Sequence, residues 1–180
     1  VRLVGVILAD IGLNIPNFRA NEKIFQLLTQ VAGRAGRGQN LGKVIIQTYN
    51  PENFALTCAQ NHDYQNFFTY ERTQRQLLKN PPFGRLATLQ LAAKTIPEAK
   101  KQTEEIVDRL YHFARQNEKA LQLEITSYPS FIPKFRGQYR FNILIKNKTT
   151  DNTISEILAK LLKEDIIKTT FKIDIDPITL

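Results

Sequence analysis

The sequence contains no methionine, a single cysteine and only two histidines. Because a translated chain begins with methionine, we expect this one to be a processed product or part of a longer protein. Cys58 alone excludes an internal disulfide, and with His62 and His112 far apart no metal-ligand cluster is expected. No apolar run approaches the roughly 20 residues of a membrane span, and no signal-peptide layout is present. We expect a soluble, cytoplasmic protein with Cys58 as a buried structural thiol.

Positive charge is concentrated at the two ends of the sequence. The formal net charge is +8 at pH 7. Residues 1–50 carry six Lys and Arg against two acidic residues, residues 83–180 carry sixteen against twelve, and residues 51–82 are neutral. This distribution predicts contacts with phosphate in two places, a nucleotide at one end and a nucleic acid at the other.

The stretch from Asn21 to Gly38 has the periodicity of an amphipathic helix. Its apolar residues recur at three- and four-residue steps, which predicts one buried side: Ile24, Leu27, Leu28, Val31, Ala32 and Ala35. At about 100° per residue, Gln30, Arg34 and Arg37 fall within roughly 60° of one another on a neighbouring face.

The glycines of this helix are expected on a third side. Gly33 and Gly36 would let another backbone approach closely, and Gly38 suits a helix C-terminus. The two arginines have an ordinary explanation, since cations in a last helical turn complement the macrodipole and are commonly solvated. They also have a chemical one, because a fixed arginine neutralises charge developing on a γ-phosphate.

The segment Gln30 to Arg37, QVAGRAGR, resembles motif VI of superfamily 2 helicases, Q-x-x-G-R-x-G-R. The preceding residues 17–23 and the full run TQVAGRAGRG narrow the resemblance to the PriA family of replication-restart helicases (primosomal protein N′). It implies that Arg37 is the arginine finger, that Arg34 is a second γ-phosphate contact and that Gln30 couples nucleotide state to lobe closure. Asp10 and Arg19 are expected to order the adjoining loop.

The resemblance implies more protein than this chain contains. No G-x-x-x-x-G-K-[ST] phosphate loop occurs, so the chain is not expected to hydrolyse ATP by itself. ATP with Mg²⁺ would be bound mainly by an upstream lobe, and a zinc-binding insertion would also lie upstream. The implied bacterial protein would recognise single-stranded and forked DNA at stalled forks and contact single-stranded-DNA-binding protein and primosome proteins.

Residues 1–84 are predicted to form two regions. Val1 to Ala9 reads as a strand buried on both faces of a parallel sheet, and Asp10 to Asn17 as a loop. With the motif helix and a strand from Val44 to Thr48, residues 1–48 form a βαβ unit, the tail of a RecA-like second helicase lobe. Residues 49–84 are a connector with a short helix from Phe54 and a longer one from Tyr64 to Leu78 that contains a Glu71–Arg75 pair.

Residues 85–180 are predicted to form a C-terminal DNA-binding domain. Strands are expected at 86–94, 121–128, 139–146 and 171–176, and helices at 97–117 and 152–164. The order βαββαβ indicates an antiparallel sheet with two helices on one face, a ferredoxin-like α+β sandwich. The resemblance implies the build of a small-subunit ribosomal protein here.

Cations alternate with aromatic residues between the second and third of these strands. The candidate DNA contacts are Lys134, Phe135, Arg136, Tyr139 and Arg140. Single-stranded nucleic acid is commonly held by cations on phosphates and rings under bases. The alternative is a basic hairpin tip whose rings pack on the sheet. The family's K-x-G-G-R-Y-R-like loop is matched except at Phe135 and Gln138, whereas the lysines at 160, 163, 168 and 172 are expected to be a solvated face.

Two other functions fit the same residues. Motif VI is shared widely, so another superfamily 2 helicase remains an alternative. A non-enzymatic module of ribosomal type, in which the arginines bind nucleic acid instead of ATP, is the second.

Overall fold

The computed structural model describes residues 3–14, 17–35, 42–163 and 171–177. The chain divides into two compact units, the first running to Leu77 and the second beginning at Leu78.

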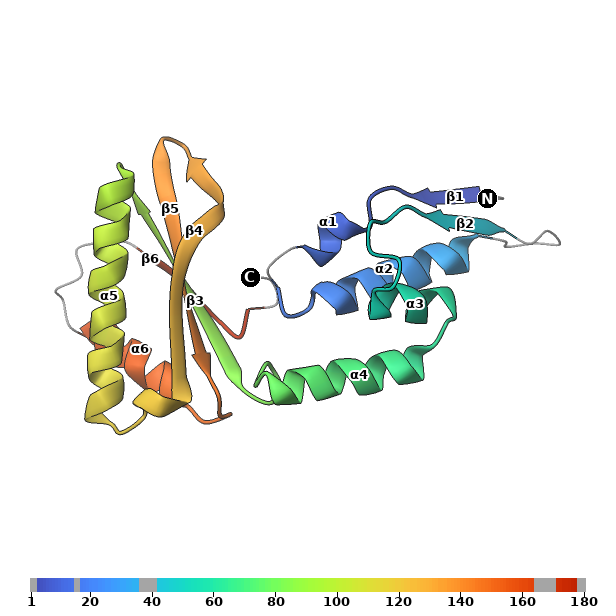
Figure 1. The fold of residues 1–180 in the computed structure, drawn as a ribbon. Coiled ribbons are helices and arrows are strands. Elements are labelled where there is room, and N and C mark those ends of the chain that lie inside the picture. Colours follow the sequence, from blue (N-terminus) through green and yellow to red (C-terminus); the bar gives the residue numbers. More distant parts are fainter. Residues whose placement is uncertain (1–2, 15–16, 36–41, 164–170, 178–180) are drawn as a thin grey trace. The chain divides into compact units, whose positions relative to one another are not determined.

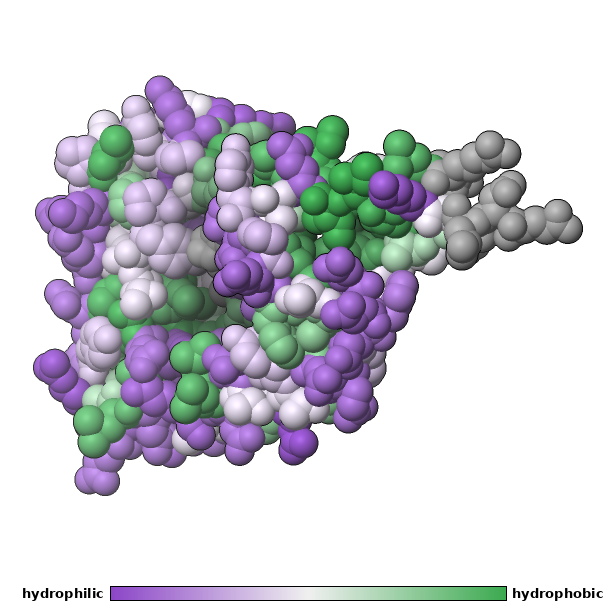
Figure 2. Space-filling view, turned by 45° about the vertical axis from the view of Figure 1, so that its right-hand side comes forward, coloured by the Kyte–Doolittle hydropathy of each residue, from purple (hydrophilic) through white to green (hydrophobic). Residues whose placement is uncertain are grey.

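The first unit contains the predicted βαβ arrangement. Strand β1 (Leu3–Val6) pairs in parallel with β2 (Lys43–Ile46), and helix α2 (Ala20–Arg34) lies between them in sequence (Figure 1). Leu3 is 56% exposed and Ile45 50%, so the prediction of a strand buried on both faces is wrong. Within the described residues this sheet has two strands, and the residues on one of its faces are exposed. Figure 2 shows hydrophobic residues gathered on the surface of this unit beside the residues drawn in grey.

Three further helices complete the first unit. Helix α1 (Asp10–Leu13) is a single turn in the segment predicted to be a loop, which corrects that prediction. Helix α3 (Phe54–Gln60) begins where predicted because the Asn53 side chain accepts hydrogen bonds from two backbone N–H groups of its first turn. Helix α4 spans Tyr64–Leu77.

These helices share one hydrophobic core. Stacked rings of Phe25 and Phe67, with centroids 4.1 Å apart, join α2 to α4. Cys58 is buried in this core, as predicted. The buried members are Ala9, Ile24, Phe25, Leu28, Ala55, Leu56, Cys58, Ala59 and Phe67.

Helix α2 is shorter than the sequence periodicity predicted. It ends at Arg34, and Ala35 has an extended backbone with ψ of 125°. The prediction that this helix continues to Gly38 is therefore wrong, because the helix ends before Ala35. The physical reason is the low helix propensity of glycine, which recurs in this part of the motif. Leu27, predicted to be buried, is 48% exposed, whereas Phe25 takes a place in the core.

The second unit is built on a four-stranded sheet with the order β4-β5-β3-β6. Its strands are β3 (Arg85–Ala93), β4 (Leu123–Phe135), β5 (Gln138–Asn147) and β6 (Phe171–Ile175). Every neighbouring pair is antiparallel. The order of elements along the chain is the one the sequence predicted, but β4 continues to Phe135 instead of ending at residue 128.

Two helices cover one face of this sheet (Figure 1). Helix α5 (Ile96–Gln116) starts at Thr95, whose hydroxyl accepts the N–H of Glu98, and helix α6 spans Thr153–Lys163. The predicted inward residues of both helices are buried, except Leu162, which is 60% exposed: Ile106, Leu110, Phe113, Ala114, Ile154, Ile157, Leu158 and Leu161. None of the described helices combines the length and apolar character needed to cross a membrane.

Gly84, at the entrance to β3, offers a test of this packing. A Cβ added there would lie 2.3 Å from the carbonyl oxygen of Lys79 and 2.6 Å from that of Asn147, so backbone would have to move. We expect Gly84→Ala to destabilise the second unit by about 1–3 kcal/mol, the usual cost of forced overpacking, in thermal or urea unfolding. Gly33→Ala is the control, because a Cβ at Gly33 meets nothing within 4 Å. Equal stability of the two variants would contradict the expectation.

Candidate functional site

Two of the three motif residues lie on one exposed strip of α2. Gln30 and Arg34 are four residues apart in the helix, and both are exposed. Arg37 lies outside the described residues. Because the helix ends at Arg34, the expectation that all three side chains leave one continuous helix is wrong, and the phase argument holds for Gln30 and Arg34 alone.

The Arg34 guanidinium is open to a ligand. Among the described residues no carboxylate lies within ion-pair distance of it, and Arg34 is in the last turn of its helix. This position fits both roles that the sequence suggests for Arg34. Its charge can complement the helix macrodipole, and its guanidinium can contact a phosphate. Gly33 does not provide the predicted close approach, since space around it is open within the described residues.

Asp10 ties the end of β1 to the end of β2. Its carboxylate accepts a hydrogen bond from the Thr48 hydroxyl at 2.9 Å and another from the backbone N–H of Tyr49 at 2.9 Å. The Tyr49 N–H, followed by the Thr48 hydroxyl, lowers the pKa of Asp10 against the opposing effect of burial. The side chain is therefore positioned to order this loop.

Arg19 is held by the carboxylate of Glu22 at the start of α2. Its Nε and Nη2 donate to the two carboxylate oxygens of Glu22 at 3.0 and 2.7 Å. Arg75 of α4 donates to Glu22 at 2.7 Å and to Glu71 at 3.0 Å, which confirms the Glu71–Arg75 pair. Arg75 also lies 5.1 Å from the ring centroid of Phe18. Hydrogen bonding from Arg19, then Arg75, lowers the pKa of Glu22 to about 2 despite burial.

The tip of the β4–β5 hairpin carries the predicted DNA-contact residues. Phe135 pairs with Gln138, so Arg136 and Gly137 form a two-residue turn with φ of 49° and 81°. Positive φ at both central positions is the mark of a type I′ turn, which matches the twist of the flanking strands. Glycine adopts it freely, but a left-handed conformation costs a residue such as Arg136 about 1–2 kcal/mol.

The cations of the tip lie over its own rings. Arg140 Cζ is 4.2 Å and Arg136 Cζ 5.3 Å from the centroid of Phe135, and Lys134 Nζ is 5.1 Å from that of Tyr139. Lys134, Phe135 and Arg136 are exposed. The structure therefore brings all five predicted residues together, with three cations available to phosphate oxygens.

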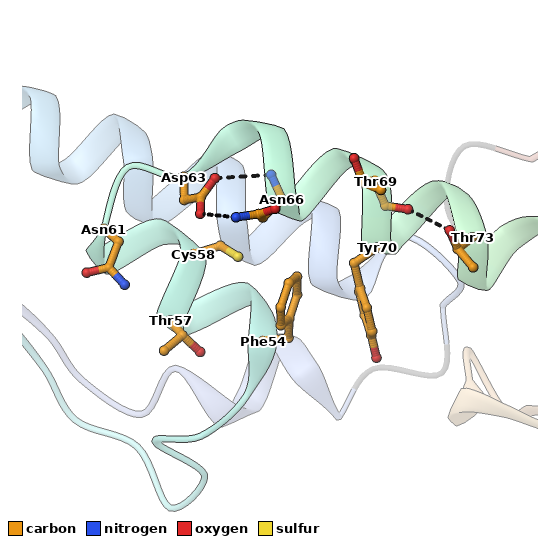
Figure 3. Close-up of a pocket in the computed structure, with 9 residues that line it drawn as sticks. All are labelled: Phe54, Thr57, Cys58, Asn61, Asp63, Asn66, Thr69, Tyr70 and Thr73. Atoms are coloured by element: carbon orange, nitrogen blue, oxygen red, sulfur yellow. Dashed lines mark hydrogen bonds between the residues drawn. The ribbon is translucent and has the colours of Figure 1, made fainter.

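A separate groove of about 540 Å³ lies between α3 and α4. Figure 3 shows the rings of Phe54 and Tyr70 side by side, with centroids 4.3 Å apart, and Asp63 hydrogen bonded to Asn66. Its lining contains no Lys or Arg and none of the predicted site residues. Sequence reasoning gave no sign of this groove because its walls come from two helices that were read separately.

Metal binding finds no support in the described ranges. No group of three or more His, Cys, Asp or Glu side chains there is arranged to hold an ion.

Comparison with known proteins gives the family of the chain. No family model matches it. It is 38% identical over 163 residues to the replication restart protein PriA of Bacillus subtilis, covering 91% of this chain and 20% of the relative. The PriA of Chlamydia pneumoniae is 34% identical over 186 residues, covering 99% of this chain and 24% of the relative. The chain belongs to the PriA family. A third member, from Rickettsia prowazekii, is 38% identical over 183 residues, covering 98% of this chain and 26% of the relative.

The chain thus spans between a fifth and about a quarter of the length of these PriA relatives. This coverage is consistent with the C-terminal segment of PriA that the motif resemblance implies. The sequence analysis missed the contact of Glu22 with Arg75. It joins residues 53 positions apart, so no local pattern could have indicated it.

The Glu22 network predicts a pH dependence of stability. Its folded pKa of about 2 lies below the ordinary value of 4.5. The stabilisation is therefore present above pH 4.5 and is lost as the pH falls from there towards about 2. We expect Glu22→Gln to reduce the loss of stability of the first unit across this range, measured by urea unfolding. Glu52→Gln, at an exposed carboxylate of the same unit, is the control and should leave the pH profile unchanged.

Proposed function

We propose that this chain is part of an ATP-dependent DNA helicase that recognises branched DNA at stalled replication forks and drives primosome assembly and replication restart. The printed name of its relatives, replication restart protein PriA, supports the process. The motif VI segment, which begins on α2, supports the helicase activity. The whole protein would act in the bacterial cytoplasm.

The two units would have separate tasks. The parallel strands β1 and β2, with α2 between them in sequence, support a partial RecA-like lobe that contributes motif VI. The strand order β4-β5-β3-β6 supports a ferredoxin-like DNA-binding domain. The helical connector of residues 49–84 would join them. Single-stranded-DNA-binding protein and primosome proteins are the proposed protein partners of the whole molecule.

ATP would be bound mainly by a lobe outside this chain. The exposed Arg34 guanidinium fits a phosphate ligand, and Gln30 on the same strip fits a role in sensing it. Arg37 would be the arginine finger that stabilises charge on the γ-phosphate. Mg²⁺ would arrive with ATP, and the zinc site would belong to an upstream insertion. This chain alone would not hydrolyse ATP.

The observation that carries the proposal is the construction of the hairpin tip. An arginine occupies a left-handed turn position that glycine or asparagine adopts at lower cost. A cation held in this conformation at an exposed hairpin tip supports a role in binding. With Lys134 and Arg140 beside it, the tip presents three cations to the phosphates of a single strand.

The salt dependence of binding tests this site. We expect the 180-residue chain to bind single-stranded or forked DNA weakly, with an affinity that falls steeply as salt rises. The double variant Arg136→Asn, Arg140→Gln should reduce the slope of log K against log salt by about 1.4, because each phosphate contact on a single strand contributes about 0.7. Fluorescence anisotropy of a labelled oligonucleotide measures both.

The control removes two cations elsewhere in the same unit. Lys160→Gln, Lys163→Gln on α6 changes the net charge equally but should leave the slope nearly intact. Equal slopes for the tip variant and the unmodified chain would exclude the tip as the phosphate contact. Asparagine at 136 tolerates the left-handed turn, so the variant keeps the fold.

A second test separates the helicase from a binding module of ribosomal type. In the full-length protein we expect Arg37→Ala to lower kcat for ATP hydrolysis by about a thousandfold or more, the scale of a lost arginine finger, with DNA affinity nearly unchanged. Lys23→Ala, at a cation of the same unit on the first turn of α2, is the control. Loss of DNA affinity in a protein without ATP turnover would support the binding module instead.

A further inference from the structure

Strand β4 is interrupted by a bulge just before the hairpin tip. Pro129 pairs with Phe141, and the next pair is Lys134 with Tyr139. Residues 130–133 of β4 therefore lie opposite Arg140 alone on β5. A bulge of this kind redirects side chains next to functional sites.

The bulge exposes a large aromatic side chain. Phe131 is 87% exposed, about twice the 42% of Phe135, while Ser130 before it is buried. An isolated exposed apolar residue is common, but this ring lies within a few residues of three cations.

Phe131 also differs from the two rings of the tip in that no cation covers it. Phe135 has Arg136 and Arg140 over it, and Tyr139 has Lys134. A ring face occupied by a cation is not free to stack on a base. Among the described residues Phe131 has no aromatic or cation–π partner.

We infer that Phe131 stacks on an unpaired base of a single strand whose phosphates bind Lys134, Arg136 and Arg140. The inference rests on the proposed function and adds to it a residue and a substrate class. Phe135 and Tyr139, the rings that the sequence predicted to stack on bases, contact the cations of the tip instead. An unpaired base is required, because the ring has no access to a base face inside a duplex.

The absence of tryptophan allows a direct optical test. In the 180-residue chain, Phe131→Trp creates the single tryptophan. We expect its emission to be quenched when a single-stranded oligothymidylate of about 16 nucleotides binds, with anisotropy of the labelled oligonucleotide reporting binding in parallel. Leu121→Trp is the matched control, because Leu121 is 91% exposed and lies just before the other end of β4, so its emission should not change.

Affinity and salt dependence separate stacking from charge. Phe131→Ala should weaken single-strand binding by about tenfold, within the range for one stacked base, and Phe131→Tyr should restore it. The salt slope should stay the same, because no phosphate contact is removed. Binding to a duplex of equal length should not change. Circular dichroism confirms that each variant is folded.

The failures of the two proposals differ. If the unmodified chain does not bind single-stranded DNA, the proposed function of the tip fails. If it binds but the emission of the Phe131→Trp variant stays constant and Phe131→Ala binds as tightly as the unmodified chain, the stacking inference fails and the phosphate site stands; Phe131 would then suit a protein partner. A smaller salt slope for Phe131→Ala would also overturn stacking, because the ring would be acting on the position of the cations.

Discussion

Burial of one face of the β4-β5-β3-β6 sheet fixes the geometry of the second unit. Ala87, Leu89 and Leu91 of β3 have no exposed surface, and Leu89 lies opposite the equally buried Ile143 of β5. A slip of one residue would turn these side chains to solvent and their polar neighbours into the core, so the register is locked. Beyond the bulge in β4, the pairs Lys134–Tyr139 and Phe135–Gln138 place Lys134 and Tyr139 on one face of the hairpin and Phe135 and Arg140 on the other. A pair of cation and ring thus lies on each side of the tip.

Periodicity allowed most of the second unit to be predicted from the sequence. Helices α5 and α6 have apolar residues at helical spacing on a single side, and each begins at a polar residue that caps it or precedes its first turn. Buried and less buried residues alternate along the strands because only one face of the sheet is covered. Under this condition the sequence of a strand shows a period of two residues. The DNA-contact candidates could be found for a related reason, since a two-residue turn holds residues close in sequence close in space.

The errors occurred where local pattern competes with tertiary structure. Helical phase predicted a continuous helix through Arg37, but a phase argument ignores the cost of successive glycines, and α2 ends at Arg34. The strand β1 looked buried on both faces because its residues are β-branched and apolar, yet burial depends on what covers them. The bulge in β4 and the contact between Glu22 and Arg75 depend on which segments meet, and no single stretch of sequence contains that information.

The construction of the sheet argues for the tip, and against the sheet face, as the site of base contact. Recognition of single strands on a four-stranded sheet uses rings on the central strands that point away from the helices. The central strands β3 and β5 have no ring in those positions: the side chains there include Gln90 and Asn142, which hydrogen bond to each other at 3.1 Å. Phe141 pairs with the buried Leu91 and belongs to the helix side. The central strands therefore offer polar groups that are already engaged with each other. The one ring beside them, Tyr128 on the edge strand β4, is half-buried and hydrogen bonds to Asn142. The tip instead offers three cations and a ring that no cation covers, which are the partners that the phosphates and an unpaired base of a single strand require.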